Sequence, residues 1–280
     1  MTPTTLGPRL GPYASLGLRF AVRVDDAAIA ARLAPLYAAC CTTDPRSPDL
    51  ELTVHSDLEA ATFELRADGE RCCVTSDADE LLAWVVWRVN DAAVHHDDDR
   101  LVLHAAAVAA GERAVLLAGP SGAGKSTLAA ALVLGGGAYM SDDSVAFDHE
   151  TGRVVSNPKP ISLDAGAIGA LERFAGARAG LRTTSGLVAP PAIGAVTRVG
   201  DALAPALVVR PCYRADSPRR VERLSQADVA ELLADQSFNF APRGRAGLAA
   251  VASIARATRG IALEYDDLGA AVATITEALA

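Results

Sequence analysis

The chain has 280 residues, of which half are hydrophobic, and its formal net charge is −8. This length is sufficient for one large domain or two small ones, and the apolar content argues against extended disorder. The acidic balance argues against a general nucleic-acid binder or a protein that binds anionic membranes. No stretch has the length and purity of a membrane span, which needs about 20 apolar residues.

Cysteine usage and the N-terminus predict a reduced, cytoplasmic protein. The five cysteines include two adjacent pairs, Cys40-Cys41 and Cys72-Cys73, and no C-x-x-C spacing is present. Neither a zinc site nor a disulfide framework is therefore supported. Residues 1–8 lack the charged start and apolar block of a signal peptide. A homo-oligomer is compatible with the sequence.

Residues 1–97 are expected to form a small α+β module. Clean apolar–polar alternation over 15–24 predicts a half-buried strand, and Asp25-Asp26 is expected to cap a short helix. A helix that begins with a capping box at Ser76 is expected to run to about Val94. Further strands are expected over residues 50–55, 62–67 and 71–75.

Residues 98–280 are expected to form a second module. It begins with strands over 101–109 and 114–118, joined by a turn. Residues 176–205 are rich in Gly, Pro, Ala and Thr, which predicts a mobile excursion. The other expected elements are strands over 138–141, 145–147, 153–155 and 207–210, and helices over 226–236, 245–258 and 267–279.

The most informative segment matches G-x-x-x-x-G-K-S/T, the pattern of a phosphate-binding loop. An apolar run suited to a buried strand precedes it, and good helix formers follow it. Lys125 is expected to reach the β- and γ-phosphates of ATP, and the hydroxyl of Ser126 is expected to bind Mg²⁺. The alternative is a glycine-rich turn with a solvated lysine. The loop consists of Gly119, Pro120, Ser121, Gly122, Ala123, Gly124, Lys125, Ser126 and Thr127.

An acidic pair, Asp142-Asp143, follows the loop after one helix and one turn. This order predicts a strand beside the loop strand that delivers carboxylates to a metal ion. One carboxylate would hold Mg²⁺ and the other would take a proton from a hydroxyl nucleophile. We assign the base to Asp142 and the metal to Asp143. The alternative is an exposed Asp-Asp turn.

Other polar residues are weaker candidates. His104 lies in a strand expected beside the loop strand, where it would orient one of the acids. The alternative is a histidine of the core whose ring nitrogens are simply hydrogen bonded. The run His95–Asp99 is interpreted as a polar turn rather than a metal site. Arginines gather in the C-terminal third, and one of them would clamp phosphate or an acidic substrate unless all are surface residues. We single out Arg243 among Arg210, Arg214, Arg219, Arg220, Arg243 and Arg245.

Three segments together resemble the kinase domain of HPr kinase/phosphorylase. They are His104–Val108, the loop 119–127 and Ser141–Val145. The chain is more similar still to the shorter HPr-kinase-related P-loop kinases of biosynthetic clusters, including those that phosphorylate lasso-peptide precursors. Asn157–Leu163 and Leu263–Leu268 also resemble these kinases, as does a helix with two tryptophans before the His104 strand. The resemblance is specific only within residues 104–163.

The resemblance implies an α/β fold, α+β overall, of the phosphoenolpyruvate-carboxykinase-like P-loop type with a mixed sheet. It implies ATP-dependent phosphorylation of a hydroxyl, often a serine of a peptide or protein, with Asp142-Asp143 as metal holder and base and His104 as their support. The glycine-rich signature of true HPr kinase/phosphorylase is not found, and Glu172 is a candidate for a later metal-binding glutamate. HPr as substrate and phosphorylase activity are therefore not implied.

Two other functions stay open. One is a small-molecule kinase on the same scaffold, and the other is a nucleotide-gated ATPase or assembly factor without an acceptor. The Leu-Ser-Gly-Gly-Gln signature of transporter ATPases and the Asn-Lys-x-Asp guanine motif are both missing from the sequence, which weighs against common forms of the latter. A peptide or small protein is the expected partner, and neither nucleic acid nor a membrane is expected.

Overall fold

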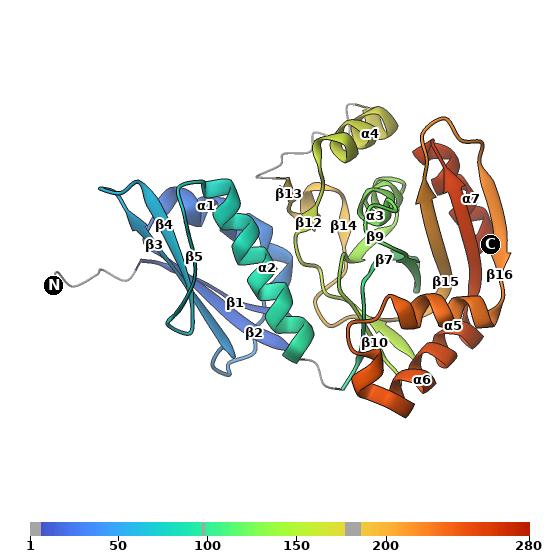
Figure 1. Cartoon of the computed structure of the whole chain (residues 1–280), viewed down its shortest axis with the longest axis horizontal. Coiled ribbons are helices and arrows are strands. Elements are labelled where there is room, and N and C mark those ends of the chain that lie inside the picture. The colour runs from blue at the N-terminus through green and yellow to red at the C-terminus, as the bar shows by residue number, and fades with distance from the viewer. Residues whose placement is uncertain (1–6, 97–98, 177–185) are drawn as a thin grey trace.

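A computed structural model describes residues 7–96, 99–176 and 186–280. These residues form a mixed α/β structure with seven α-helices and several sheets. Two sheets lie side by side along the long axis of the molecule (Figure 1). We call residues 7–96 the N-terminal body and the other two ranges the C-terminal body. None of the described helices combines the length and the apolar character that crossing a membrane requires.

The sheet of the N-terminal body has five strands in the order β1-β2-β3-β4-β5. Its parallel pair, β2 and β3, is connected through helix α1 (Ala27–Leu36), since parallel strands need a crossover. As expected, Asp26 caps α1, and its carboxylate accepts hydrogen bonds from two backbone N–H groups. Helix α2 (Ala78–His96) packs on the sheet. The strands are β1 (Arg9–Ser15), β2 (Leu18–Val24), β3 (Leu50–Asp57), β4 (Thr62–Ala67) and β5 (Glu70–Thr75).

Two sequence predictions for this body were wrong in detail. The strand expected over 15–24 is interrupted by a turn at Leu16-Gly17, where both residues have positive φ, and a separate strand, β1, precedes that turn. The glycine and proline inside β1 are typical of turns, which is why β1 was not predicted. Helix α2 is capped by Asp77 rather than Ser76, because the Asp77 carboxylate accepts the backbone N–H of Asp79 at 2.8 Å.

The sheet of the C-terminal body follows the path β14-β9-β7-β8-β15-β11-β10-β6, and β17 and β16 extend it from β15. Strands β8, β15 and β17 are parallel, whereas β7 is antiparallel to both of its neighbours. The strands of this path are β6 (Leu101–Leu103), β7 (Ala105–Ala110), β8 (Arg113–Ala118), β9 (Ala138–Ser141), β10 (Val145–Asp148), β11 (Arg153–Val155), β14 (Ala195–Val196), β15 (Ala202–Tyr213), β16 (Arg220–Leu224) and β17 (Arg259–Tyr265). A separate pair consists of β12 (Ile161–Ser162) and β13 (Leu187–Val188).

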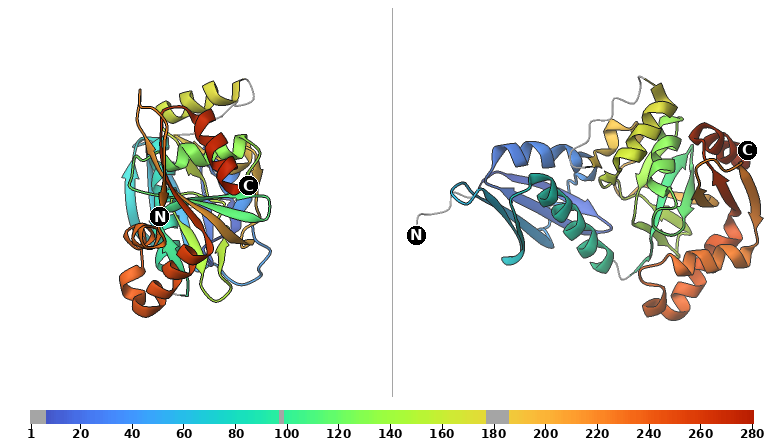
Figure 2. Two further views of the ribbon diagram at one scale, coloured as in Figure 1. Left: turned by 90° about the vertical axis from the view of Figure 1, so that its right-hand side faces the viewer. Right: turned by 45° about the horizontal axis from the view of Figure 1, so that its top comes forward.

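Helices cover both faces of this sheet. Helices α3 and α7 pack on one face with α4 over α3, and α5 and α6 pack on the other (Figures 1 and 2). Side chains of β8 alternate accordingly: Val115 and Leu117 join the core of the α3 face, whereas Leu116 joins the opposite core. The helices are α3 (Lys125–Leu134), α4 (Ala165–Ala175), α5 (Gln226–Asp235), α6 (Phe240–Ala257) and α7 (Leu268–Leu279).

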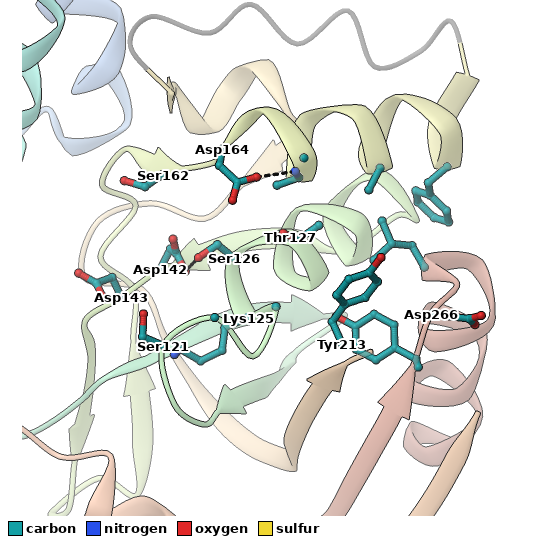
Figure 3. Close-up of a pocket in the computed structure, with 18 of the residues that line it drawn as sticks. Ser121, Lys125, Ser126, Thr127, Asp142, Asp143, Ser162, Asp164, Tyr213 and Asp266 are labelled. Carbon is teal, nitrogen blue, oxygen red and sulfur yellow. Dashed lines mark hydrogen bonds between the residues drawn. The ribbon is translucent and has the colours of Figure 1, made fainter. Parts of the chain in front are cut away.

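The strand expected over 101–109 divides at His104 into β6 and β7. These pair with different partners, β6 with β10 and β7 with β8 and β9. Contrary to expectation, β9 does not lie beside the loop strand β8, because β7 lies between them. Both β8 and β9 run antiparallel to β7, so they end at the same sheet edge, and Asp142 still lies near the loop (Figure 3).

The excursion expected over 176–205 falls partly outside the described residues, which omit 177–185. Its described remainder contains the two-residue strands β13 and β14 and the start of β15, joined by segments without strand structure. Strand β16 was not predicted, because its five residues, Arg-Val-Glu-Arg-Leu, carry three charges and are mostly exposed at the edge of the sheet.

The two bodies share part of their packing. Three residues of the C-terminal body, Val102, Ala146 and Leu187, belong to the hydrophobic cluster that fills the N-terminal body. Hydrogen bonds also cross between the bodies: the hydroxyl of Ser15 donates to the Asn157 side chain at 3.0 Å, and a second contact joins the Cys40 thiol to a backbone carbonyl. The two bodies are thus joined by both apolar and polar contacts.

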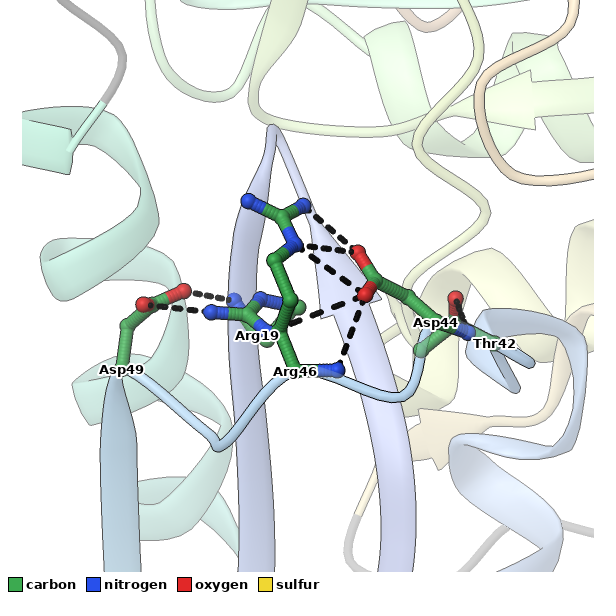
Figure 4. A network of polar contacts seen from close by, with 5 residues as sticks. All are labelled: Arg19, Thr42, Asp44, Arg46 and Asp49. Carbon is green, nitrogen blue, oxygen red and sulfur yellow. Dashed lines mark hydrogen bonds and ion pairs between the residues drawn. The ribbon is translucent and has the colours of Figure 1, made fainter.

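A polar network ties the loop between α1 and β3 to β2 (Figure 4). The guanidinium and the backbone N–H of Arg19, a residue only 8% exposed, both donate to the Asp49 carboxylate at 2.9 Å. Arg46 donates to Asp44 at 2.9 Å, and these hydrogen bonds hold the pKa of Asp44 at about 2. Because Asp49 directly precedes β3, the network keeps the parallel β2–β3 pair in register.

Candidate active site

The glycine-rich segment 119–124 connects the end of β8 to the first residue of α3, the strand–loop–helix order that the sequence pattern requires. Gly122 and Gly124 have φ values of 79° and 91°, which residues with a side chain rarely adopt. Gly124 also lacks space, since a Cβ atom there would lie 2.7 Å from the hydroxyl of Tyr265. Both backbone geometry and packing therefore require glycine at position 124.

Lys125 begins helix α3 and is only 7% exposed. Its ammonium group donates to the carbonyls of Gly119 at 2.7 Å and Pro120 at 3.1 Å. Burial lowers its pKa, against the opposing attraction of Asp142 and Asp143. A solvated lysine on a glycine turn, the alternative left open by the sequence, is therefore excluded. The site combines a buried cation with the positive end of a helix dipole.

Asp142 directly follows β9 and is 2% exposed. Its Oδ1 atom accepts a hydrogen bond from the Ser126 hydroxyl at 3.0 Å. Burial raises the pKa of Asp142 to about 6, although Lys159 and Lys125 act in the opposite direction. The charged form of this carboxylate is thus short of stabilising partners, and a cation bound beside Ser126 would favour it.

The Asp143 carboxylate lies apart from that of Asp142 (Figure 3), and its side chain is 47% exposed. Its Oδ1 atom lies 3.3 Å from Nε2 of His104, and its Oδ2 atom lies 3.7 Å from Nζ of Lys159. Asn90 of α2 donates to Oδ2 at 3.3 Å. The hydrogen bond with His104 and, after it, the positive charge of Lys159 hold the pKa of Asp143 at about 2 against the effect of burial.

The backbone of Asp143 has φ 66°, in the left-handed region. Aspartate tolerates this region better than most residues with a side chain, but the conformation is still strained. Two contacts that involve Ser144 close the turn: its N–H donates to the Asp142 carbonyl at 2.8 Å, and its own carbonyl accepts the Ser141 hydroxyl at 2.5 Å. With this backbone conformation, the two consecutive carboxylates lie beside different groups, Asp142 beside Ser126 and Asp143 beside His104.

The contacts of the two carboxylates disagree with the roles that were assigned from the sequence, which gave the metal to Ser126 and Asp143. Ser126 is hydrogen bonded to Asp142, and His104, the expected support of the base, contacts Asp143. The alternative of an exposed Asp-Asp turn is excluded, because Asp142 is buried. His104 is likewise no isolated core histidine: its backbone breaks the strand by donating to the carbonyl of Gln236 at 2.6 Å.

A cleft of about 710 Å³ contains the loop and both carboxylates (Figure 3). One end is polar and is lined by His104, Asp142 and Asp143. Figure 3 shows Tyr213 across the loop from the two carboxylates, on the same side as Asp266, and we call this part the aromatic end. The rings of Phe174 and Tyr265 also line the cleft. The loop lies between the two ends, so a ligand that contacts both ends must pass over it.

Tyr213, at the end of β15, is the exposed ring of the aromatic end, with 53% of its surface accessible. It contacts Tyr265 edge-on, with ring centroids 5.9 Å apart and planes at 65°. Its backbone N–H donates to the carbonyl of Ala123 in the loop at 3.2 Å. The ring is therefore held at a fixed place relative to the loop.

Several predicted residues lie outside the cleft. Glu172 is exposed on α4 and does not line it, whereas Asp164, the N-cap of that helix, does. Arg243 donates to the backbone carbonyl of Asp99 at 2.8 Å and does not line the cleft either. The same holds for the other arginines singled out from the sequence, which are Arg210, Arg214, Arg219, Arg220 and Arg245.

Sequence reasoning missed further polar residues of the site, and three of them matter for its charge and geometry. Arg173 of α4 lines the cleft, but a basic residue in the last turn of a helix is too common to stand out. Lys159 is 6% exposed and lies near Asp143, yet the sequence shows it only as part of the segment 157–163. Asn90 gave no signal, because the middle of a helix far from the loop is not where an active-site residue is sought.

In the described parts of the chain, no group of three or more His, Cys, Asp or Glu side chains is arranged to hold a metal ion. His95 and His96 end α2, and the run that they begin continues into residues 97–98, outside the described range. Mg²⁺ is usually held by one or two carboxylates, substrate phosphates and water. The buried carboxylate of Asp142 and the hydroxyl of Ser126 are donors of that kind, so these residues fit Mg²⁺.

Comparisons with known proteins add little to this geometry. Neither a protein-family model nor a curated protein matches the chain. Among solved structures, the chain is similar to the Hpr(Ser) kinase/phosphatase from Coxiella burnetii, with 15% sequence identity and a TM-score of 0.30. The match covers 62% of this chain and 91% of the other. A function can therefore be inferred only from the residues of the cleft.

Proposed function

We propose that the protein is a kinase that uses Mg²⁺ and transfers the γ-phosphate of ATP to a hydroxyl group. The observation that carries this proposal is the convergence in one cleft of a buried loop lysine, Lys125, with two carboxylates in different surroundings, Asp142 and Asp143. A nucleotide-binding loop alone performs no transfer, and the second carboxylate with its histidine supplies the part that an acceptor needs.

The nucleotide would lie along the cleft. Its phosphates would lie on the loop, where Lys125 and the N-terminus of α3 provide positive charge. Its base would lie at the aromatic end, where the exposed ring of Tyr213 offers a stacking surface. Arg173 of α4, which lines the cleft, would meet phosphate charge.

We assign Asp142 to the metal side and Asp143 to the acceptor side, the reverse of the sequence assignment. The hydrogen bond between Ser126 and Asp142 supports the first role. The exposure of Asp143 supports the second, because a hydroxyl substrate can approach it but cannot approach the buried Asp142. When bound, Mg²⁺ would neutralise charge on the phosphate oxygens.

The acceptor hydroxyl would donate a hydrogen bond to Asp143. Its oxygen bonds to the γ-phosphorus, its proton passes to the Asp143 carboxylate, and the bond from that phosphorus to the β–γ bridging oxygen breaks and leaves ADP. His104 and Lys159 keep Asp143 ionised, so that it can accept the hydrogen bond that orients the hydroxyl. Because its pKa is low, it would take the proton late, once the bond to phosphorus has made the hydroxyl acidic. Burial of Lys125 keeps its charge close to the phosphates rather than in water.

We propose that the acceptor is a serine of a peptide or small protein. Asp143 contacts both bodies, since Asn90 of α2 donates to its Oδ2 atom and His104 lies beside its Oδ1 atom. The acceptor side of the cleft therefore lies next to the N-terminal body, and a peptide longer than the cleft would extend onto that body, which a metabolite would not do.

Mass spectrometry of candidate acceptors tests the proposal. The protein is incubated with ATP, Mg²⁺ and either serine-containing peptides or small hydroxyl metabolites, with Lys125→Ala as the control. A phosphate mass gain on a peptide that is lost in Lys125→Ala supports it. A gain on a metabolite alone identifies a small-molecule kinase, and ADP release with every acceptor unchanged identifies an ATPase.

Two variants test the assignment of the carboxylates. Asp142→Asn and Asp143→Asn should each lower transfer by at least about a hundredfold. High Mg²⁺ or Mn²⁺ should partly restore Asp142→Asn, because a weakened metal site is filled by mass action, and should not restore Asp143→Asn. Metal rescue of Asp143→Asn alone would return the roles to the sequence assignment.

A further inference from the structure

We infer that Asn90, a residue of the N-terminal body, positions the carboxylate of Asp143, so that this body completes the active site. The inference rests on the proposed function for the role of Asp143. Its basis is a contact between helix α2 and a strained turn that lies 53 residues further along the chain.

The Asn90 side chain bridges two consecutive residues of the turn. Its Nδ2 atom donates to Oδ2 of Asp143 at 3.3 Å, and its Oδ1 atom accepts the hydroxyl of Ser144 at 2.7 Å. The opposite orientation of the amide would bring its oxygen against the carboxylate, which is repulsive, so the two contacts together fix the amide. A fixed amide holds the carboxylate in one direction.

The turn needs such support because Asp143 has φ 66°. A strained residue keeps its conformation only when its surroundings impose it. Contacts within the turn fix the backbone, but His104, Lys159 and Asn90 determine where the carboxylate lies. Among these three, Asn90 alone belongs to the N-terminal body.

A second connection from the N-terminal body reaches the same turn. The hydroxyl of Ser15, at the end of β1, donates to Oδ1 of Asn157, and Nδ2 of Asn157 donates to the Ser144 hydroxyl at 3.4 Å. Ser15, Asn157 and Ser144 are all fully buried, so their polar atoms depend on one another for hydrogen bonds. The turn is therefore held by β1 and α2 together.

The local sequence points the same way. Asn90 lies within the 19-residue helix α2 between the buried positions Val89 and Ala93. Asparagine is a poor helix former, because its side chain competes for backbone hydrogen bonds. Its presence at this position is explained by the bridge to the turn rather than by helix formation.

Loss of the bridge should lower phosphoryl transfer without weakening nucleotide binding. The loop and Tyr213 belong to the C-terminal body, and Asn90 is not among the residues that line the cleft. A reacting group displaced by about 1 Å lowers rates by about a hundredfold. We therefore expect kcat to fall by roughly ten- to a hundredfold, with the dissociation constant of a fluorescent ATP analogue changed by less than about twofold.

The test uses two substitutions and a control in the full chain. Asn90→Asp keeps the acceptor for Ser144 but removes the N–H donor to Asp143, and Asn90→Leu removes both contacts at similar size. Asp91→Asn is the control, because its partners Arg88 and His95 lie on the same helix and outside the cleft. Both Asn90 variants should have a lower kcat than the wild type, and the control should have an unchanged kcat. A normal kcat in Asn90→Asp, or parallel loss of nucleotide affinity, would overturn the inference.

A double-mutant cycle provides a readout that does not depend on activity. Urea unfolding is measured for the wild type, Asn90→Leu, Asp143→Asn and the double variant at pH 7. If the two side chains interact, the effects on the unfolding equilibrium constant should depart from additivity by at least about twofold. If the wild type transfers phosphate to no acceptor, the proposed function fails, and additivity in this cycle would separately refute the Asn90–Asp143 contact.

Discussion

Replacement of Asp142 by asparagine should stabilise the protein at neutral pH while it abolishes the proposed transfer. The side chain is almost fully buried, and burial raises its pKa from 3.8 to about 6. An ionised carboxylate at this position therefore costs free energy that the neutral asparagine does not. Asparagine also keeps an oxygen that can accept the hydrogen bond from Ser126.

The size and the pH dependence follow from this pKa. Below pH 3.8 the carboxyl is protonated in both the folded and the unfolded chain, so it costs nothing. Between pH 3.8 and about 6, the carboxyl of Asp142 ionises in the unfolded chain but stays largely protonated in the folded chain. The folded protein therefore loses stability as the pH rises through this window. The full cost is about 3 kcal/mol, at ~1.4 kcal/mol per pH unit. For a chain of this size, the gain in Tm of Asp142→Asn is roughly 6 to 12 °C.

Thermal and urea unfolding at pH 8 and pH 4.5, with EDTA and without nucleotide, measures the effect. At pH 4.5 the gain should fall to about 1 kcal/mol. Asp143→Asn is a matched control one residue away. The pKa of Asp143 is lowered to about 2 by His104, so its ionised form stabilises the fold above pH 3.8 and this contribution is lost as the pH falls towards 2. Asp143→Asn should therefore destabilise the protein at both values of pH.

The reasoning is refuted if Asp142→Asn is less stable than the wild type at pH 8, or if its gain is the same at both values of pH. The first result would mean that the buried charge is stabilised by partners that outweigh its desolvation. The second would mean that the gain has nothing to do with ionisation.

Three further predictions concern the loop and the aromatic end of the cleft. Lys125→Ala should abolish binding of a fluorescent ATP analogue in a titration and should lower Tm by a few degrees, because the ammonium also holds two loop carbonyls; affinity within about twofold of wild type would contradict this. Gly124→Ala should destabilise the fold and block nucleotide binding, since the φ of this residue is positive and the added Cβ would meet the Tyr265 hydroxyl. The double variant with Tyr265→Phe should recover part of the lost Tm. No recovery would show that the strained φ alone is responsible. Tyr213→Ala should weaken nucleotide binding by about 1–3 kcal/mol, the range for base stacking, while Tyr213→Phe should retain it; equal affinities of the two variants would show that the base lies elsewhere.

Features encoded by neighbouring residues could be predicted from the sequence. The loop between a strand and α3 and the cap of α1 by Asp26 both depend on residues a few positions apart. Strand β9 and its position before the acidic pair were predicted for the same reason. Local propensity and turn chemistry carry this information, so no tertiary contact was needed to find it.

Features set by contacts between distant residues could not be predicted. The insertion of β7 between β8 and β9 depends on strand pairing, and no pattern within β7 reveals it. The different surroundings of Asp142 and Asp143 come from Ser126 on one side and from Asn90 and His104 on the other. Two adjacent aspartates look alike in a sequence, so their different surroundings could not be predicted from it.

The shared packing of the two bodies limits how the chain can be divided. A fragment that begins at residue 98 would expose Val102, Ala146 and Leu187, which lie in the cluster of the N-terminal body, and would leave Asn157 without its partner Ser15. The boundary visible in the sequence near residue 97 is therefore no place for modular exchange. An N-terminal body transplanted from another protein would have to reproduce both the shared hydrophobic cluster and the buried hydrogen bonds of Ser15 and Asn157. A change of the proposed acceptor would therefore have to arise by substitutions around Asp143 in an intact chain.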